Sequence, residues 1–528
     1  MRRFFSYGPV DCEEHFCVPR RELIDKCVEQ LVGKPEKGGH YFTIWAPRQT
    51  GKTWLMRQVK KEIEKRYKDR FTLGMMSMQG VVLKEEDDEE RFLDRVPKLF
   101  RDTFSIRLDE PPSTWEDFQS LFHRDSGIFK SPLILFIDEF DSLPSRVIDQ
   151  LVTLFRDIYL NRESYLLHGL ALIGVRAVLG VESDRGSPFN IQRSLHVENF
   201  TKDEVYDLYN QYIEESGQII KEEVIEAVYN VTRGQPGLVC WFGELLTEKY
   251  NPGMDKVIDM DVWEDVYLNA IHVEWNNTVL NLIKKAKGKY LEQVLDIFNH
   301  SDIEFSLDVD WCSYLYLNGV IDVDTVKDEL GKKHKVCRFS NPFIQKRLYN
   351  ALTNDFLGRK VPIYALRIGD DLSDVFEGEE LDLPALIERY RDYLKRLKQK
   401  NISPFKEQPK RSDLNIYESG GHFHLYHWLM NALSRRCSVS PEFPTGNGRV
   451  DIHLRCNNKE GVIEVKSFRD MHTLEQSILQ ASEYAKKLNL HSIVLVVFLT
   501  GVEEDEVMQL KAERVLDGVK IYVEPVLI

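Results

Sequence analysis

Apolar residues in the first half of the chain form short continuous runs that alternate with stretches of helical period. The run YFTIW, at 41–45, precedes a polar loop and the segment 54–67, in which apolar residues recur about every four positions. A second run, LILFID at 133–138, ends in an acid, and a third, LALIGV, covers 170–175. Such runs are typical of strands buried on both faces of a parallel sheet, so the pattern predicts an α/β domain.

Helical periodicity dominates the middle of the chain. One helix is expected to begin after Thr201, because Glu204 three residues later completes a capping box. An amphipathic helix follows Gly234-Gln235-Pro236, and the periodicity continues from 251 to about 355, interrupted by a short predicted hairpin.

The C-terminal region changes to a mixed order of helices and strands. The expected elements are a helix at 414–436, strands near 437–443, 449–455 and 461–467, a helix at 473–488, a strand at 491–499, a further helix, and a last strand at 520–528. This order begins αβββαβ.

Charged residues alternate with apolar ones in two of these strands. Glu464 and Lys466 share one face of the segment 461–468, and Asp451 lies between apolar neighbours in 448–454. The three charges can therefore converge, but alternation alone fits either an active site or the solvated face of a hairpin.

The flanking helices offer further polar groups. Glu418 lies early in the preceding helix, and Gln476, Gln480 and Tyr484 are spaced by four residues in the following one. This polar stripe completes a site if it faces the charged strands, and is surface if it faces water.

Composition limits the classes of protein. A chain of 528 residues predicts several domains, and a formal net charge of −15 argues against a uniformly basic nucleic-acid surface. The stretch 389–411 nevertheless holds nine Lys and Arg residues against Asp392 and Glu407. It is interpreted as a basic helix that runs into an exposed linker, which either is a solvated connector or contacts phosphates.

The cysteines and the apolar runs bear on the compartment. Of eight cysteines only Cys12 and Cys17 are close, without zinc-site spacing, so isolated reduced thiols are expected. No apolar run approaches the roughly 20 residues that cross a bilayer, and the first residues lack a signal-peptide core. A cytoplasmic protein without a membrane partner is therefore expected.

The loop APRQTGKT between the first strand and its helix has the chemistry of a phosphate-binding site. Its backbone N–H groups and the helix N-terminus can surround phosphates, Lys52 can contact the outer phosphates, and the Thr53 hydroxyl can coordinate Mg²⁺. Ala46 replaces the usual first glycine, and its small methyl group is expected to be tolerated. The other expected loop contacts are Arg48, Gln49, Thr50 and Gly51.

Two acids end the buried strand 133–138. Asp138 is expected to hold Mg²⁺ directly or through water, and Glu139 to polarise the attacking water. Arg176, at the end of the next apolar strand, can sense the γ-phosphate.

Residues 18–250 resemble the P-loop ATPases of the AAA+/STAND group, particularly archaeal-type ATPases with a PRQxGKT loop, an hhhhDE strand and a Gly-x-Pro motif in the helical lid. The resemblance implies that ATP and Mg²⁺ are cofactors, that Gln235 and Pro236 lie near the adenine, and that Pro19-Arg20 precede the first helix of the pocket. The region that follows is similar to the winged-helix lid of such ATPases, which contacts either DNA or other domains.

The C-terminal region resembles the PD-(D/E)xK nucleases, particularly those attached to AAA-ATPase-like modules. Its motifs are Glu418, GRVD with Asp451, IEVK with Glu464 and Lys466, and Gln480-x-x-x-Tyr484. The resemblance implies that Asp451, Glu464 and the carbonyl of Val465 hold Mg²⁺ or Mn²⁺, and that Lys466 orients water or stabilises the phosphorane charge. Glu418 would complete the metal shell through water, and Gln480 would position phosphate or metal-bound water.

The expected fold class is a multidomain α/β protein. Its predicted parts are a P-loop NTPase core at 1–200, a helical lid at 201–280, a winged-helix-like domain at 281–360, a basic linker at 361–412, and an αβββαβ restriction-endonuclease-like domain at 413–528.

The leading hypothesis is a homo-oligomeric nuclease controlled by its ATPase module. It would cut nucleic acid, with DNA favoured over RNA, in defence against foreign nucleic acid or in mobile-element biology. The alternative is a signalling or DNA-binding ATPase whose nuclease fold only recognises its target, and a third option is a replication-initiator-like loader. The sequence leaves open whether ATP is hydrolysed or only bound.

Overall fold

Two compact units make up the chain in the computed structural model. The structure describes residues 1–8, 10–81, 83, 89–174, 194–299, 303–327, 332–357, 365–367, 372–378, 380–402, 405, 418–433, 437–444, 449–456, 459–500 and 507–528. The first unit comprises Met1–Leu280 with Tyr314–Val320 and Asn341–Phe343, and the second comprises Asn281–Ser313, Ile321–Ser340 and Ile344–Ile528.

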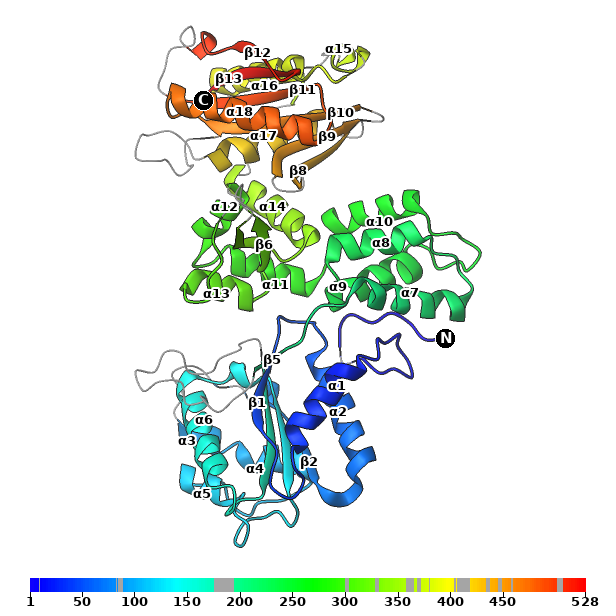
Figure 1. Cartoon of the computed structure of the whole chain (residues 1–528), viewed down its shortest axis with the longest axis vertical. Helices are drawn as coiled ribbons and strands as arrows, with labels where there is room; N and C mark the ends of the chain where they lie inside the picture. The colour runs from blue at the N-terminus through cyan, green and yellow to red at the C-terminus, as the bar shows by residue number, and fades with distance from the viewer. Residues whose placement is uncertain are drawn as a thin grey trace. The chain divides into compact units, whose positions relative to one another are not determined.

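A parallel five-stranded sheet forms the centre of the first unit (Figure 1). Its strands lie in the order β2 (Thr72–Ser77), β3 (Leu133–Asp138), β4 (Leu167–Gly174), β1 (Tyr41–Trp45) and β5 (Ser194–His196). The strands predicted at 41–45, 133–138 and 170–175 are confirmed where described.

Helices cover both faces of this sheet. Ile134 and Phe136 of β3 pack with α1 (Arg21–Val32) and α2 (Lys52–Tyr67). Leu133, Leu135 and Ile137 point to the opposite core, which the remaining helices close. These are α3 (Glu89–Leu93), α4 (Val96–Phe104), α5 (Trp115–Ser120) and α6 (Ser145–Leu160). Burial on both faces explains why the strand is apolar at every position before Asp138.

A helical region follows the sheet. It contains α7 (Lys202–Ser216), α8 (Glu222–Thr232), α9 (Pro236–Glu244), a π-helical turn at Leu245–Lys249, and α10 (Met260–His272). The predicted capping box is confirmed, because the Glu204 amide donates to Thr201 Oγ1 at 3.2 Å and the Thr201 amide donates to the Glu204 carboxylate at 2.8 Å.

Three helices, a hairpin and a long helix come next in the chain. They are α11 (Asn277–Ala286), α12 (Leu291–Asn299), α13 (Asp310–Leu317), β6 (Ile321–Lys327), β7 (Lys333–Phe339) and α14 (Pro342–Leu357). β6 and β7 pair antiparallel, so the predicted hairpin is present.

A six-stranded mixed sheet dominates the second unit (Figure 1). Its order is β12 (Ala512–Leu516), β13 (Val519–Leu527), β11 (Ser492–Leu499), β10 (Lys459–Ser467), β9 (Arg449–Cys456) and β8 (Ser438–Pro444). α17 (Glu418–Leu433) precedes the sheet, and α18 (Met471–Lys487) connects β10 to β11. The element order αβββαβ agrees with the sequence prediction. The further helix predicted before the last strand is wrong in part, because Ala512–Leu516 pair with β13 as a strand.

The predicted basic linker is partly a packed helix. After the short α15 (Ser373–Glu377), α16 (Leu383–Gln399) buries Leu386, Tyr390 and Leu394. Arg391 of α16 donates to the carbonyl of Pro525 at 2.8 Å and pairs with the buried carboxylate of Glu524 on β13. Residues 383–399 therefore belong to the C-terminal unit. The basic helix predicted at the start of 389–411 is confirmed, but its assignment to a linker is wrong, because its apolar side chains are buried.

Four cysteines are paired, contrary to the expectation of isolated thiols. Disulfides join Cys12 to Cys17 and Cys437 to Cys456. The second bridge ties the residue before β8 to the last residue of β9, which no sequence spacing indicated. Within the described residues, no helix has the length and apolar character needed to span a membrane.

Candidate functional site

The loop between β1 and α2 has the backbone conformation that a phosphate-binding loop needs. Gly51 has a φ of 88°, and Gln49 also adopts a positive φ, of 58°. Ala46 is not among the described residues with positive φ, and its methyl group is fully buried. Alanine is therefore accommodated at this position without the conformational freedom of glycine.

Lys52 begins α2 and points back into the loop. Its Nζ donates to the carbonyls of Ala46 and Pro47, each at 2.7 Å. Burial lowers the pKa of Lys52 to about 8, while the charges of Asp141 and Asp138 oppose the shift. The ammonium is thus held in a desolvated position, where a phosphate would stabilise its charge.

The acids at the end of β3 lie beside the start of α2. Thr53 Oγ1 donates to Asp138 Oδ2 at 2.9 Å, and the Glu139 amide donates to Asp138 Oδ1 at 2.9 Å. Burial, followed by the charge of Asp138, raises the pKa of Glu139. Glu139 has a φ of 53°, in the left-handed region that non-glycine residues seldom adopt. The Thr53 hydroxyl and the Asp138 carboxylate are therefore close enough to share a cation as ligands. The raised pKa of Glu139 makes its carboxylate a better proton acceptor.

The N-terminus of α9 contacts the same loop. Gln235 caps α9 by accepting from the Leu238 amide at 2.6 Å, and its Nε2 donates to the carbonyls of Arg48 and Gln49 at 3.3 and 3.4 Å. The Gly237 amide also donates to Gln49 O, at 3.0 Å. Pro236, between these two residues, is thereby placed near the loop, and its position beside the adenine stays a prediction. The predicted sensor Arg176 lies outside the described residues.

Asp141 is a site residue that the sequence analysis missed. Its charge is the strongest described influence that favours the ammonium form of Lys52. Gly174 lets it approach, because a Cβ there would meet Asp141 Oδ1 at 2.5 Å. The available signal was a third acid within four residues of Asp138, directly after a buried strand.

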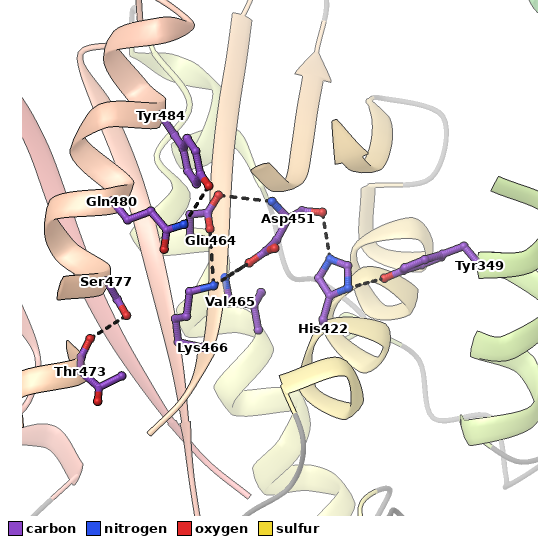
Figure 2. A network of polar contacts seen from close by, with 10 residues as sticks. All are labelled: Tyr349, His422, Asp451, Glu464, Val465, Lys466, Thr473, Ser477, Gln480 and Tyr484. Carbon is purple, nitrogen blue, oxygen red and sulfur yellow. Dashed lines mark hydrogen bonds and ion pairs between the residues drawn. The ribbon is translucent and has the colours of Figure 1, made fainter. Parts of the chain in front are cut away.

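A second cluster of charges lies on β9 and β10 of the other unit (Figure 2). Lys466 Nζ lies 3.8 Å from Asp451 Oδ2 and 3.8 Å from Glu464 Oε2, so both carboxylates converge on one ammonium. The side chains of Asp451, Glu464 and Lys466 are 17%, 3% and 21% exposed. A solvated hairpin face would leave such side chains open to water, so this interpretation of the strand pattern does not hold for these three residues.

Main-chain groups fix the two carboxylates. The Val465 amide donates to Asp451 Oδ2 at 2.6 Å, and the Asp451 amide donates to Glu464 Oε1 at 3.3 Å. The cluster therefore brings two carboxylates and one ammonium together in a largely buried place. A divalent cation bound there would compensate carboxylate charge that burial removes from water.

The polar stripe on α18 divides into two parts. Gln480 Nε2 donates to the Tyr484 hydroxyl at 2.8 Å (Figure 2). Burial, followed by the charge of Glu464, raises the pKa of Tyr484. The Tyr484 side chain lies next to that of Glu464 in Figure 2. Gln476 is exposed and contacts His472 at 3.2 Å, so it is not brought to the cluster. Glu418 is the first residue of α17, but its side chain lies outside the described part.

The donor set at this cluster fits a hard divalent cation. Mg²⁺ is commonly held by one or two carboxylates, with water and substrate phosphates completing its shell. Asp451 and Glu464 supply those carboxylates, and the carbonyl of Val465 is the main-chain ligand expected from the sequence. Across the described ranges, no group of three or more His, Cys, Asp or Glu side chains is placed to hold a metal ion, and this cluster supplies two carboxylates.

The loop, the acid pair and the parallel sheet together define the first unit as a P-loop nucleoside triphosphatase fold. Residues 5–281, more than half of the chain, match the family described as AAA-like domain. The chain therefore belongs to the AAA-like domain family, and its N-terminal part is an AAA-like ATPase domain.

Matches to solved structures cover about two thirds of the chain. The Walker-type ATPase PABY2304 of Pyrococcus abyssi is 18% identical with a TM-score of 0.45, and the match covers 65% of this chain and 99% of that one. The ORC1 protein of Aeropyrum pernix, solved in complex with DNA, is 14% identical with a TM-score of 0.31, covering 64% and 92%. The RuvB Holliday junction branch migration motor of Thermotoga maritima is 14% identical with a TM-score of 0.34, covering 61% and 92%. No curated protein matched the chain.

Proposed function

We propose that the chain is an ATP-hydrolysing, metal-dependent nuclease, in which the nucleotide state of the AAA-like domain controls phosphodiester cleavage by the C-terminal domain. The observation that carries the cleavage function is the convergence of Asp451 Oδ2 and Glu464 Oε2 on Lys466 Nζ, each at 3.8 Å. DNA is the preferred substrate, and a homo-oligomer is the expected assembly.

The burial of the cluster supports catalysis over a purely structural role. Removing a carboxylate from water costs free energy unless its charge is compensated. A structural pair would need one carboxylate and one ammonium, whereas here a second carboxylate is added beside the first. The second carboxylate is the additional ligand that a metal-dependent cleavage site needs and a simple ion pair does not.

Each side chain has a role that follows from its position. A bound Mg²⁺ or Mn²⁺ would polarise the scissile phosphate and lower the pKa of a coordinated water. Asp451 and Glu464 hold this cation, with the carbonyl of Val465. Lys466 stabilises negative charge that develops on the phosphate, and Gln480, fixed by the Tyr484 hydroxyl, positions phosphate or water. Glu418 is assigned to the outer metal shell on the resemblance alone.

The ATPase chemistry rests on the loop and the acid pair. Lys52 contacts the outer phosphates, and Thr53 with Asp138 holds Mg²⁺. Glu139, whose pKa is raised by burial, accepts the proton of the attacking water.

A cleavage assay tests the proposal. Labelled single- and double-stranded DNA and RNA are incubated with the protein, with Mg²⁺, Mn²⁺ or EDTA, and with or without ATP. The proposal expects metal-dependent cutting that is lost in Lys466→Ala. The matched control is Lys486→Ala, which removes an exposed lysine that pairs with Asp517 and should cut as the wild type does. Unchanged cutting by Lys466→Ala overturns the site, and no cutting of any substrate by the wild type favours the recognition-module hypothesis.

A further inference from the structure

A buried histidine and tyrosine, both outside the predicted catalytic motifs, adjoin the carboxylate cluster. His422 of α17 makes a 2.9 Å hydrogen bond through Nε2 to the main-chain oxygen of Asp451. Its Nδ1 lies 3.1 Å from the hydroxyl of Tyr349 on α14. In Figure 2 the His422 ring lies between the Tyr349 hydroxyl and the main-chain oxygen of Asp451.

The chemistry of the groups fixes the direction of the bond to Asp451 and, for a neutral imidazole, of the bond to Tyr349. The carbonyl oxygen of Asp451 can only accept, so Nε2 of His422 must carry the proton. In neutral histidine Nδ1 is then the acceptor, and the Tyr349 hydroxyl donates to it. The tyrosine therefore selects the tautomer in which His422 donates to Asp451.

Burial makes both hydrogen bonds of His422 costly to break. Tyr349 is 0% exposed and His422 is 3% exposed, so breaking either bond leaves a polar group without water. The Tyr349 ring also packs against Phe423 and Tyr426, with centroids 4.6 Å apart in both pairs. The hydroxyl is thus held in place by the aromatic contacts around its ring.

The bond from His422 falls where regular strand pairing stops. The described pairing of β9 with β10 runs from Cys456 opposite Lys459 to Ile452 opposite Ile463, one residue short of Asp451. At Asp451 the hydrogen bonds to β10 use side-chain carboxylates instead of paired main-chain groups. The Asp451 amide donates to the Glu464 carboxylate, and the Asp451 carboxylate accepts from the Val465 amide. The carbonyl of the same residue is the group that His422 holds.

We infer that His422, oriented by Tyr349, is a positioning residue that sets the backbone of Asp451 so that its carboxylate meets Glu464 and Lys466. This inference rests on the proposed nuclease function of that cluster. Neither residue contacts the reacting groups, and both act through the placement of Asp451. Partners that orient metal ligands in this way typically change metal affinity or activity by about 10- to 100-fold when removed.

Tyr349 belongs to α14, so the residues that position Asp451 extend beyond the predicted nuclease segment 413–528. α14 lies in the part predicted as winged-helix-like, yet it makes a second anchor to the C-terminal sheet. Lys346 Nζ donates to the carbonyl of Val439 on β8 at 3.0 Å and lies 4.8 Å from the centre of the Tyr426 ring. The geometry of the cluster therefore depends on α14 as well as on residues 413–528.

The chain contains a matched control for this pair. On the same helix α17, His424 Nδ1 lies 2.6 Å from the hydroxyl of Tyr390, and both residues are buried. This pair has the same chemistry, but its tyrosine comes from α16 and no described hydrogen bond links it to Asp451. Tyr390→Phe thus reproduces the loss of a buried tyrosine–histidine bond without touching the cluster.

The experiment measures Mn²⁺ binding to the full chain without nucleotide, by electron paramagnetic resonance, alongside cleavage and thermal unfolding. The variants are His422→Leu, His422→Gln and Tyr349→Phe, with Tyr390→Phe as control. Asp451→Asn defines the Mn²⁺ signal that belongs to the cluster. We expect His422→Leu to weaken Mn²⁺ binding and cleavage by about 10-fold or more, and Tyr349→Phe by a smaller factor. His422→Gln, whose amide can donate to the Asp451 carbonyl, should recover most of the loss.

The control separates positioning from a purely structural role. The inference predicts that Tyr390→Phe lowers the unfolding temperature about as much as Tyr349→Phe does but leaves Mn²⁺ binding unchanged, whereas a purely structural role of these buried pairs predicts equal effects of the two variants on Mn²⁺ binding. The inference is overturned if His422→Leu binds Mn²⁺ and cuts as the wild type does, if His422→Gln is as impaired as His422→Leu, or if Tyr390→Phe weakens Mn²⁺ binding equally. A wild-type protein that neither cuts nor shows an Asp451-dependent Mn²⁺ signal overturns the proposed function itself, and the inference with it.

Discussion

The affinity for ATP should depend on pH through Lys52. Burial lowers the pKa of this ammonium to about 8 in the protein without nucleotide. Bound phosphates favour the charged form, so ATP binding should raise this pKa again and take up a proton. The charged form prevails below pH 8 and is lost above it, so the affinity for ATP should fall as the pH rises through this value.

The size of the effect follows from the fraction of charged lysine. With the pKa of Lys52 at about 8, the ammonium is charged in most molecules at pH 7 and in only about one in eleven at pH 9. If the lysine stays charged in the complex, the affinity for ATP falls about tenfold between these values, which corresponds to roughly 1.4 kcal/mol.

Isothermal titration with ATP at pH 7, 8 and 9 measures this dependence, and buffers of different ionisation enthalpy report the proton uptake. Lys52→Arg is the control, because a guanidinium remains charged over this range and its affinity should stay level. Asp141→Asn removes a charge that favours the ammonium, so the fall should begin at a lower pH. A level affinity for the wild type, or an equal fall for Lys52→Arg, would refute the reasoning.

Three further predictions concern single side chains. Glu139→Gln should bind ATP but lose about 100- to 10,000-fold in hydrolysis, measured as phosphate release, because it cannot accept the proton of the attacking water; normal hydrolysis would exclude it as the base. Cys456→Ser opens the bridge to Cys437, so it should lower the free energy of unfolding, measured by urea denaturation, by about 3 kcal/mol in oxidising buffer. Under reductant the variant and the wild type should be equally stable, and equal stability in oxidising buffer would contradict the pairing. Thr201→Ala should destabilise α7 by about 1 kcal/mol through loss of its cap, measured by amide hydrogen exchange, and unchanged protection would contradict the capping role.

Local patterns explain which parts of the nucleotide site could be predicted. The strand 133–138 is apolar on both faces, ends in Asp138 and is followed directly by Glu139. This pattern is informative, because acids at the end of a buried strand have few structural explanations. The capping box at Thr201 is equally local, since both partners lie within three residues. Asp141 was missed because its influence on Lys52 depends on the close approach that Gly174 permits, and this contact is not visible in the sequence.

The C-terminal unit shows a prediction that was only partly right. The basic helix predicted within 389–411 is present, but it begins at Leu383 as α16, and Leu386, Tyr390, Leu394 and Leu397 recur at helical spacing and are all buried. The prediction of a linker rested on the positive charges of this helix and not on its apolar face. One of its cations, Arg391, is used internally to pair with the buried Glu524.

Contacts between distant segments could not be predicted. Tyr349 and His422 are separated by 73 positions, and neither belongs to a periodic pattern that would single it out. The disulfide between Cys437 and Cys456 depends on the register of β8 and β9, since Ser438 lies opposite Arg455. Strand alternation placed Asp451, Glu464 and Lys466 on one face, but only their burial separates a buried cluster from a solvated hairpin.

The rate of DNA cleavage with and without ATP tests the central claim most directly. It is measured with Mg²⁺ for the wild type, Lys52→Ala and Lys466→Ala. We predict that ATP changes the wild-type rate severalfold, that Lys52→Ala cuts at one rate in both conditions, and that Lys466→Ala does not cut. Equal wild-type rates with and without ATP would contradict control by the AAA-like domain, and cutting by Lys466→Ala would contradict the assigned nuclease site.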